Sequence, residues 1–426
     1  MSTDLPDPDQ PLTEAAAEAY VARTCFKTGP PGQIGVELEW LLHDVTNPAA
    51  PVHTTRLCGV LSPDLARGAL STEPGGQLEL SSRPHPSLAG CLAETAADLT
   101  ALRAAAGDCG VRLTGLGVDP LRPPARQVFT PRYDAMERFF ARTGPHGEVM
   151  MCSTAAVQVC VEAATPDDTA PARWSALHAL GPVLVAAFAN SPLREGRPTG
   201  WRSTRQAVWA RLDPGRSAHP DVDVPDPAEA WARYTLAAEV LAVMAPDGHW
   251  EAPPGLTLRG WLRGDGPRPA TRADVDYHLS TLFPPVRPRG CLELRVIDAQ
   301  PGDGWTAVAT AVAALLDDPK ARDAALAVAE PVRGRWEQAA RDGLADSALA
   351  AAASGCFAAA LDGAERLGLP APARAALAEF TEHYVDRARC PADDVLDAWV
   401  IGGAAAVLAV PDATELGEES VSCRPS

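Results

Sequence analysis

Three segments of this chain alternate apolar and polar residues, which is the pattern of a β-strand with one buried face. They are IGVELEWLL at Ile34–Leu42, STEPGGQLELSS at Ser71–Ser82 and CLELRVID at Cys291–Asp298. The apolar residues of each segment would face a core, whereas glutamates and an arginine would share the opposite face. We expect the three strands to bring these faces together. Carboxylates crowded in this way need cations between them.

The polar face of these strands offers oxygen ligands without histidine or cysteine. Glu37 and Glu39 belong to the first strand, and Glu79 follows a Pro-Gly-Gly turn, where glycine lets the backbone approach a ligand closely. Such hard ligands suit Mg²⁺ or Mn²⁺. The alternative is that these are ordinary solvated strand faces, and that Glu293 and Arg295 simply form an ion pair on one strand.

A cationic segment stands out in an otherwise acidic chain. Between Asn190 and Arg216 it carries Arg194, Arg197, Arg202, Arg205, Arg211 and Arg216. Arginine makes planar, forked contacts with carboxylates and phosphates. Together with hard metal ions, this cluster indicates phosphoryl transfer, in which cations offset charge in the transition state. The alternative is a solvated surface in which only some of the six arginines matter.

The composition excludes several classes of partner. The formal net charge of −18 over 426 residues argues against nucleic acid and anionic membranes. The N-terminus has no apolar secretion signal, and the apolar stretch at 398–410 is too short to span a bilayer. The ten cysteines show no Cys-x2-Cys spacing. We therefore expect a cytoplasmic enzyme with reduced thiols.

Strand patterns precede residue 300 and Ala-rich helical patterns follow it, which favours an α+β fold. We expect a disordered leader at 1–11, a catalytic sheet-and-helix core at 12–305, a helical part of the same domain at 306–410, and a loose tail at 411–426. Further strands are predicted at 111–116 and 150–164. Helices are predicted at 12–25, 87–107, 133–142, 174–189, 203–212 and 227–245, and after 306 at 306–316, 319–330, 333–361 with a break inside it, 372–388 and 392–410.

Several of these segments, in this order, resemble the plant-type glutamate–cysteine ligase family over roughly residues 34–301. The matching pieces are GVELEW, STEPGGQLELSS, AAVQV, ANSPLREGRPTGWRSTRQAVW, DVDYHLSTLFPPVR and LELRVIDAQP. The length and the Ala- and Pro-rich composition are most similar to the actinobacterial branch, whose ligase supplies γ-glutamylcysteine to ergothioneine synthesis. The resemblance implies a glutamine synthetase-like fold, with a curved, mainly antiparallel sheet forming a funnel.

The resemblance also implies a reaction and a set of site residues. ATP would phosphorylate the side-chain carboxylate of L-glutamate, and the amine of L-cysteine would attack the γ-glutamyl phosphate. Arg205 and Arg295 would hold a substrate carboxylate or the transferring phosphoryl group. The ligands implied for two or three Mg²⁺ ions, with Mn²⁺ as a possible substitute, are Glu37, Glu39, Glu73, Gln77, Glu79 and Glu293. The substrate-binding residues implied are Gln158, Trp201, Arg202, Arg205 and Arg295.

The chain departs from the plant proteins at one matching position, where Cys160 replaces asparagine after the VQV strand. No cysteine spacing matches the redox-regulated cysteines of the plant enzymes, so no disulfide is predicted. Two alternatives remain open: a related ligase that joins glutamate to a different amine, and a relative that binds metal and nucleotide without catalysis. The oligomeric state is not predicted.

Overall fold

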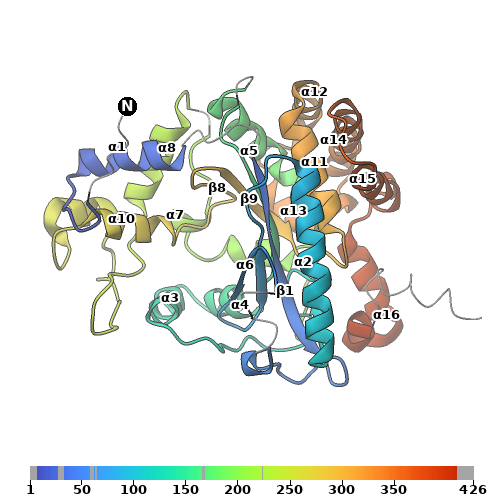
Figure 1. Cartoon of the computed structure of the whole chain (residues 1–426), viewed down its shortest axis with the longest axis horizontal. Coiled ribbons are helices and arrows are strands. Elements are labelled where there is room, and N and C mark those ends of the chain that lie inside the picture. The colour runs from blue at the N-terminus through green and yellow to red at the C-terminus, as the bar shows by residue number, and fades with distance from the viewer. Residues whose placement is uncertain are drawn as a thin grey trace, which may run out of the picture.

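The computed structural model describes residues 7–26, 33–57, 62, 65–165, 168–222 and 224–409 (Figure 1). Within them a seven-stranded antiparallel sheet has the order β2-β3-β1-β5-β9-β8, and β4 pairs with the far end of β1. The strands are β1 (Ile34–Asp44), β2 (Ala69–Thr72), β3 (Leu78–Ser81), β4 (Val111–Thr114), β5 (Ala156–Val161), β8 (Val286–Pro288) and β9 (Leu292–Asp298). The strands that carry the predicted site residues are therefore neighbours.

The strand register places the polar residues on one face of the sheet. In β1, Glu39 pairs with Glu79 of β3, and Glu37 pairs with Gln158 of β5. Paired residues of an antiparallel sheet point to the same side. The intervening residues point to the opposite side, where Leu38 and Leu80 are buried. The period-2 pattern thus sorts each strand into a core face and an acidic face.

Helices cover the core face of the sheet. Helices α2 (Leu88–Asp108), α5 (Ala170–Ala187) and α11 (Trp305–Asp317) contact its strands. Almost all side chains of α11 are buried, because the helices after it pack on its outer side (Figure 1). Those in contact with α11 are α12 (Pro319–Ala329), α14 (Ser347–Arg366) and α15 (Ala371–His383), whereas α13 (Trp336–Asp342) packs on α5. Helix α16 (Pro391–Ala409) follows them in the chain. A helical layer therefore covers one face of the sheet, and the acidic residues lie on the opposite face.

By length and composition, α14 is the one helix of the described chain that could cross a membrane, but 50% of its apolar window is buried inside the protein. It packs against α11, α12 and α15. This burial is typical of the core helix of a globular domain.

A second group of helices includes those that border the acidic face. It comprises α1 (Glu14–Cys25), α3 (Pro131–Ala141), α4 (His146–Ser153), α6 (Thr204–Trp209), α7 (Pro214–Ser217), α8 (Pro227–Ala237), α9 (Leu258–Gly260) and α10 (Arg272–Leu279). A smaller hydrophobic cluster, including Met136, Phe140, Met151 and Val208, joins α3, α4 and α6. Short elements complete the described chain: the hairpin β6 (Leu193–Arg194) and β7 (Arg197–Pro198), and the turns η1 (Thr54–Leu57), η2 (Trp261–Asp265), η3 (Glu330–Val332), η4 (Gly343–Ala345) and η5 (Val385–Arg387).

The α+β class is confirmed, but two predicted elements are wrong in part. Residues 150–153 were expected in a strand and instead end α4, where Val149 to Cys152 are buried on every side and show no alternation. The helix predicted over 227–245 ends at Ala237, because Glu239 and Ala242 form extended bridges with Thr257 and Glu251.

The first part of the expected leader, 1–6, and the whole of the expected tail, 411–426, lie outside the described residues, as does residue 410 at the end of the predicted helical part. The described end of the leader lies against α10, where Pro8 and Gln10 accept backbone hydrogen bonds from Ala273 and Arg272.

Candidate active site

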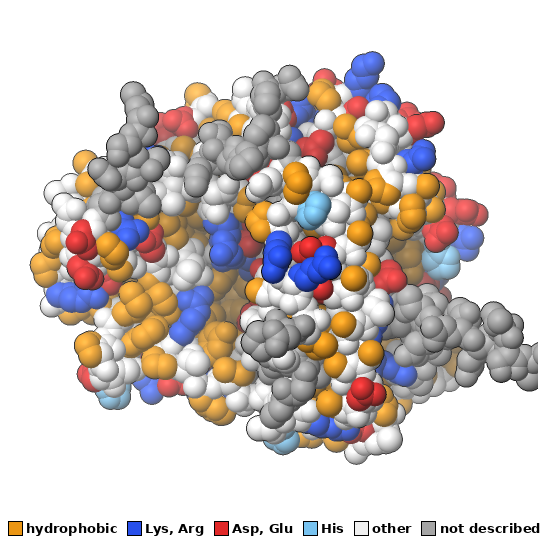
Figure 2. Space-filling view, viewed as in Figure 1, with side chains coloured by type: hydrophobic (Ala, Val, Ile, Leu, Met, Phe, Trp, Pro, Cys, Tyr) orange, Lys and Arg blue, Asp and Glu red, His pale blue; other side chains and the backbone are white. Residues whose placement is uncertain are grey.

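A cavity of about 520 Å³ lies on the acidic face of the sheet. Figure 2 shows a hollow in this face of the molecule with Lys and Arg side chains around it. Of the predicted site residues, the cavity is lined by Glu37, Glu39, Glu73, Gln77, Glu79, Gln158 and Arg295. Sequence segments more than 200 residues apart are therefore brought to one site.

Glu37, Glu39 and Glu79 form the acidic centre of this cavity. Each offers a carboxylate oxygen that lies within 4.8 Å of those of the other two, a spacing that could hold a metal ion. Serine hydroxyls orient two of them: Ser81 donates to Glu37 Oε2 at 3.3 Å, and Ser71 donates to Glu79 Oε1 at 2.8 Å. Oxygen ligands at this separation suit Mg²⁺ or Mn²⁺.

Three carboxyls of the cavity, those of Glu37, Glu39 and Glu73, resist ionisation in the absence of a cation. Burial, followed by repulsion from Glu79 and other neighbouring carboxylates, raises the pKa of Glu37 to about 8. Burial also raises the pKa of Glu39 to about 7. The pKa of Glu73 is raised well above its ordinary value by burial and then by the charge of Glu39. A divalent cation would reverse these shifts, because an opposite charge favours the ionised carboxylate.

Gln158 connects the acidic centre to the cationic side of the cavity. Its amide nitrogen donates to Glu37 Oε1 and, at 2.8 Å, to Glu39 Oε1. Its amide oxygen accepts a hydrogen bond from Arg295 Nη1. The amide is thus oriented by two carboxyl groups on one side and a guanidinium on the other, and β5 fixes its position between β1 and β9.

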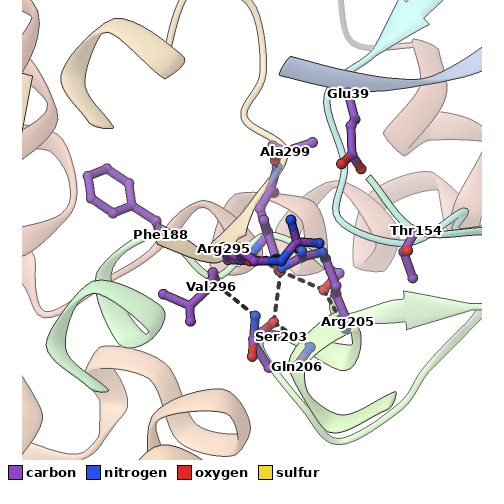
Figure 3. Close-up of polar contacts among 12 residues, drawn as sticks. Glu39, Thr154, Phe188, Ser203, Arg205, Gln206, Arg295, Val296 and Ala299 are labelled. Atoms are coloured by element: carbon purple, nitrogen blue, oxygen red, sulfur yellow. Dashed lines mark hydrogen bonds and ion pairs between the residues drawn. The ribbon is translucent and has the colours of Figure 1, made fainter. Parts of the chain in front are cut away.

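Arg205 lies at the start of α6, where Ser203 caps the helix by accepting a hydrogen bond from the backbone N–H of Gln206. The residue is only 3% exposed, and its Nη2 donates to the carbonyl oxygen of Arg295 at 3.0 Å. Its Nε and Nη1 have no hydrogen-bond partner. Figure 3 shows Arg205 and Arg295 side by side, with Glu39 above them. Its Nη1 lies 3.9 Å from Asp298 Oδ1, and Arg205 borders a small separate cavity with Arg295 rather than the cavity of the acidic centre. Buried donors without a hydrogen-bond partner fit an anionic ligand group.

The structure places Glu293 outside the acidic centre. Its carboxylate is 1% exposed and accepts hydrogen bonds from Arg287 Nε at 2.6 Å, Arg295 Nη1 at 3.1 Å and Arg289 Nη1 at 3.4 Å. Burial alone would raise the pKa of Glu293, but Arg287 and Arg295 outweigh it and lower the pKa to about 2. Its part in metal binding stays a prediction, which would require it to exchange an arginine for the metal.

Gln77 lines the cavity, but its amide already has protein partners. Its oxygen accepts from the backbone N–H of Gly75 at 2.9 Å, and its nitrogen donates to the carbonyl oxygens of Met151 and Thr154 at 3.3 and 3.0 Å. These bonds attach the glycine turn to α4 and so fix the neighbouring Glu73. Its role as a metal ligand also stays a prediction.

Trp201 and Arg202 do not line the cavity of the acidic centre. The indole of Trp201 lies 4.9 Å from the guanidinium of Arg211 and borders a separate cavity with Trp336. Arg202 Nε donates to Asp393 Oδ1 of α16 at 2.8 Å. Both residues thus connect the arginine-rich loop with the C-terminal helices.

Several residues that line the cavity were not predicted from the sequence. They include Arg132, Tyr133 and Met136 from α3, Trp209 from α6, Asp276 and Ser280 from the end of α10, and Arg287 and Arg289 from the β8–β9 hairpin. The sequence around α3 is rich in Pro, Arg and aromatic residues, which could have marked it as a candidate site segment. That composition does not show which of its side chains point into the cavity.

Two solved structures have the same fold. The glutamate–cysteine ligase of Francisella tularensis in complex with AMP has a TM-score of 0.53 and 14% identity, covering 89% of this chain and 87% of that chain. A bifunctional glutathione synthetase from Pasteurella multocida has a TM-score of 0.53 and 13% identity, and the match covers 93% of this chain and 53% of that chain. This chain therefore has the α+β fold of these two proteins, which is the glutamine synthetase-like fold expected from the sequence.

Sequence relatives narrow this class to a family. The glutamate–cysteine ligase EgtA of Mycobacterium tuberculosis is 40% identical, covering 95% of this chain and 94% of that protein. EgtA of Mycolicibacterium smegmatis is also 40% identical, and the match covers 92% of this chain and 93% of that protein. The chloroplastic glutamate–cysteine ligase of Brassica juncea is 30% identical, and the match covers 68% of this chain and 61% of that protein. The model of glutamate–cysteine ligase family 2 matches residues 33–414. The chain belongs to this family, which confirms the resemblance seen in the sequence.

Proposed function

We propose that this chain joins the γ-carboxylate of L-glutamate to the amine of L-cysteine at the expense of ATP, giving γ-glutamylcysteine, ADP and phosphate. One observation carries the proposal: a chain that is 40% identical to EgtA over 95% of its length has carboxylates facing arginines across one cavity. By the same similarity, the product would serve ergothioneine biosynthesis.

The acidic centre supplies the ligands for magnesium. Glu37, Glu39 and Glu79 meet the distance requirement, and Glu73 lies in the same cavity. Two or three Mg²⁺ ions, or Mn²⁺ in their place, would neutralise the phosphates of ATP and the charge that develops in phosphoryl transfer. The raised pKa values of Glu37 and Glu39 mean that bound metal must displace protons from these two carboxyls.

The arginine side of the cavity binds the reacting anion. Arg295 lines the cavity and is held by Gln158 and Glu293. Arg205 lies beside it and has two nitrogens without a hydrogen-bond partner, one of them 3.9 Å from Asp298. These groups orient the γ-carboxylate of glutamate for attack on the γ-phosphorus of ATP, and ADP leaves. The amine of cysteine then attacks the acyl carbon of the γ-glutamyl phosphate, and phosphate leaves. Positioning and charge neutralisation account for both steps.

Oxygen transfer tests this route directly. Glutamate labelled with ¹⁸O in its γ-carboxylate is turned over with Mg-ATP and cysteine, and the products are analysed by mass spectrometry. The proposal predicts γ-glutamylcysteine and one ¹⁸O atom in each phosphate released. Unlabelled phosphate would contradict the acyl-phosphate route.

The alternative amine acceptor is tested in the same assay. Replacing cysteine with 2-aminobutyrate, glycine or alanine shows whether the acceptor pocket selects a different amine, and product formation with one of these but not with cysteine would favour the related ligase.

A further inference from the structure

The cations of the cavity are unequally neutralised. Arg287 and Arg295 are largely buried and share the carboxylate of Glu293. Arg289 contacts the same carboxylate only at 3.4 Å, and its side chain is 58% exposed. Arg132 also lines this cavity, but it forms no ion pair with a carboxylate among the residues that the structure describes. Its charge is therefore available to a ligand.

Arg132 joins α3 to the end of α10, on one wall of the cavity, through neutral partners. It lies in the first turn of α3, and its Nη1 donates to Ser280 Oγ at 3.1 Å. Its Nη2 donates to the carbonyl oxygen of Ser280 at 3.0 Å, just after the end of α10. The Tyr277 ring lies 5.3 Å from the guanidinium and supports it. Both Arg132 and Ser280 line the cavity.

A phosphate group is a better partner for Arg132 than Ser280 is. Guanidinium–phosphate hydrogen bonds are charge-assisted and frequently bidentate, whereas a hydroxyl and a carbonyl oxygen are neutral acceptors. The deeply buried Arg205 and the adjoining Arg295 are next to the acidic centre, where the transferring phosphoryl group would react. Arg132 is half-buried and lies on a different wall, formed by α3 and α10.

We propose that Arg132 binds the phosphates of the nucleotide that are not transferred, exchanging Ser280 for phosphate oxygens when the nucleotide enters. The inference rests on the proposed use of ATP. It assigns Arg132 to nucleotide affinity and leaves glutamate binding to Arg205 and Arg295. The same cation would remain in contact with ADP after the transfer.

Nucleotide binding without turnover tests this assignment. The affinities of the wild-type protein and of Arg132→Gln for Mg-ADP and for adenosine are measured by calorimetry, with neither amino-acid substrate present. We expect about a tenfold weaker affinity of Arg132→Gln for Mg-ADP and an unchanged affinity for adenosine, because only phosphate contacts are lost. Arg132→Lys keeps the charge without the fork and should give an intermediate affinity.

A matched control separates this role from general effects on α3. Arg138 lies on the same helix, is exposed and pairs with Glu251 outside the cavity, so Arg138→Gln should bind Mg-ADP like the wild type. Unchanged Mg-ADP affinity in Arg132→Gln would overturn the inference, and so would an equal loss of adenosine affinity, which would indicate a distorted pocket.

Steady-state kinetics distinguish failure of this inference from failure of the proposed function. Arg132→Gln should raise the KM for ATP about tenfold and leave the KM for glutamate unchanged; a matching rise in both would overturn the assignment. A wild-type protein that binds no Mg-ADP would overturn both the inference and the proposed function. A wild type that turns over normally, with an unaffected Arg132→Gln, would overturn the inference alone.

Discussion

Single residues set the charge balance of the cavity. The acidic centre of Glu37, Glu39 and Glu79 was predictable, because period-2 alternation in two strands shows which side chains share a face. Arg132 was not predictable, because it lies in a Pro- and Arg-rich segment whose direction depends on the packing of α3 on α4 and α6. The ion pair of Glu293 with Arg295 was one of the alternatives seen in the sequence, and the structure contains it. The contacts of Glu293 with Arg287 and Arg289 were not predicted, because they depend on the pairing of β8 with β9.

Replacing Glu79 with glutamine tests the acidic centre. The amide keeps the shape of the side chain but is a weaker ligand for Mg²⁺, so turnover should fall about 100-fold or more while the fold is retained. Binding of Mn²⁺, followed by electron paramagnetic resonance, should weaken in parallel. Glu229→Gln on the exposed side of α8 is the control and should behave like the wild type. Normal turnover and normal Mn²⁺ binding in Glu79→Gln would remove this residue from the metal site.

The raised pKa values predict a pH-dependent effect of magnesium on stability. Glu37 and Glu39 have pKa values of about 8 and about 7 in the folded protein, against about 4.3 in an unfolded chain. Between about pH 7 and pH 8 these two carboxyls hold more protons in the folded protein than in the unfolded chain, so their contribution to the free energy of unfolding of the metal-free protein falls as the pH rises. Below about pH 7 the lowered pKa values of the buried His43, His178 and His278 act in the opposite direction.

Protons compete with Mg²⁺ for the same oxygens, so the rise in Tm caused by Mg²⁺ should be larger at pH 8 than at pH 6. Thermal unfolding with and without Mg²⁺ at the two pH values measures this. Equal shifts at both would show that these carboxyls do not take up the metal.

At the scale of elements, the turn between β2 and β3 positions the acidic centre. Glu73 precedes this turn, and Gln77 fastens it to α4. The sequence predicted the turn and the strands β1, β3 and β9, because glycine and alternation are local signals. It did not predict that residues 150–153 end α4, because an apolar run that is buried on every side has neither the period of a strand nor that of a surface helix.

Gly75→Ala tests how closely the turn must approach α4. A Cβ at this position would overlap the backbone of Cys152, so the turn or the helix would have to move. We expect the free energy of unfolding to fall by about 1–3 kcal/mol, with a further loss of activity as Glu73 is displaced. Denaturant unfolding measures the first effect. Gly107→Ala in α2 is the matched control, because nothing lies within 4 Å of its Cβ and alanine favours a helix; equal stability changes in the two variants would contradict this account.

At the scale of the whole molecule, the C-terminal helices support the site from behind the sheet. Alanine-rich composition predicted their helical character, but not their contacts, which join segments far apart in the chain. Arg202 shows this: its backbone N–H donates to the carbonyl oxygens of Ala340 and Arg341, and its side chain pairs with Asp393. The family resemblance implied Arg202 as a substrate contact, but in the structure this residue links the arginine-rich loop to α13 and α16.

Arg202→Gln distinguishes the two roles of this residue. If Arg202 holds the helices in place, the variant should lose about 1–2 kcal/mol of unfolding free energy, because a half-buried charged hydrogen bond is removed, while the KM for glutamate stays unchanged. Denaturant unfolding and steady-state kinetics measure the two quantities. Arg233→Gln, which removes an exposed ion pair on α8, should change stability by less than about 0.5 kcal/mol. A raised KM for glutamate at full stability would return Arg202 to the substrate site.

The central claim is that one cavity couples ATP cleavage to ligation of glutamate and cysteine. The most direct measurement is ADP release by the purified protein with Mg-ATP, with each amino acid alone and with both together. The account predicts rapid ADP release only when glutamate and cysteine are both present, in step with γ-glutamylcysteine detected by mass. ADP release that is independent of glutamate, or no release with cysteine or any other amine by a protein that binds Mg-ATP, would contradict it.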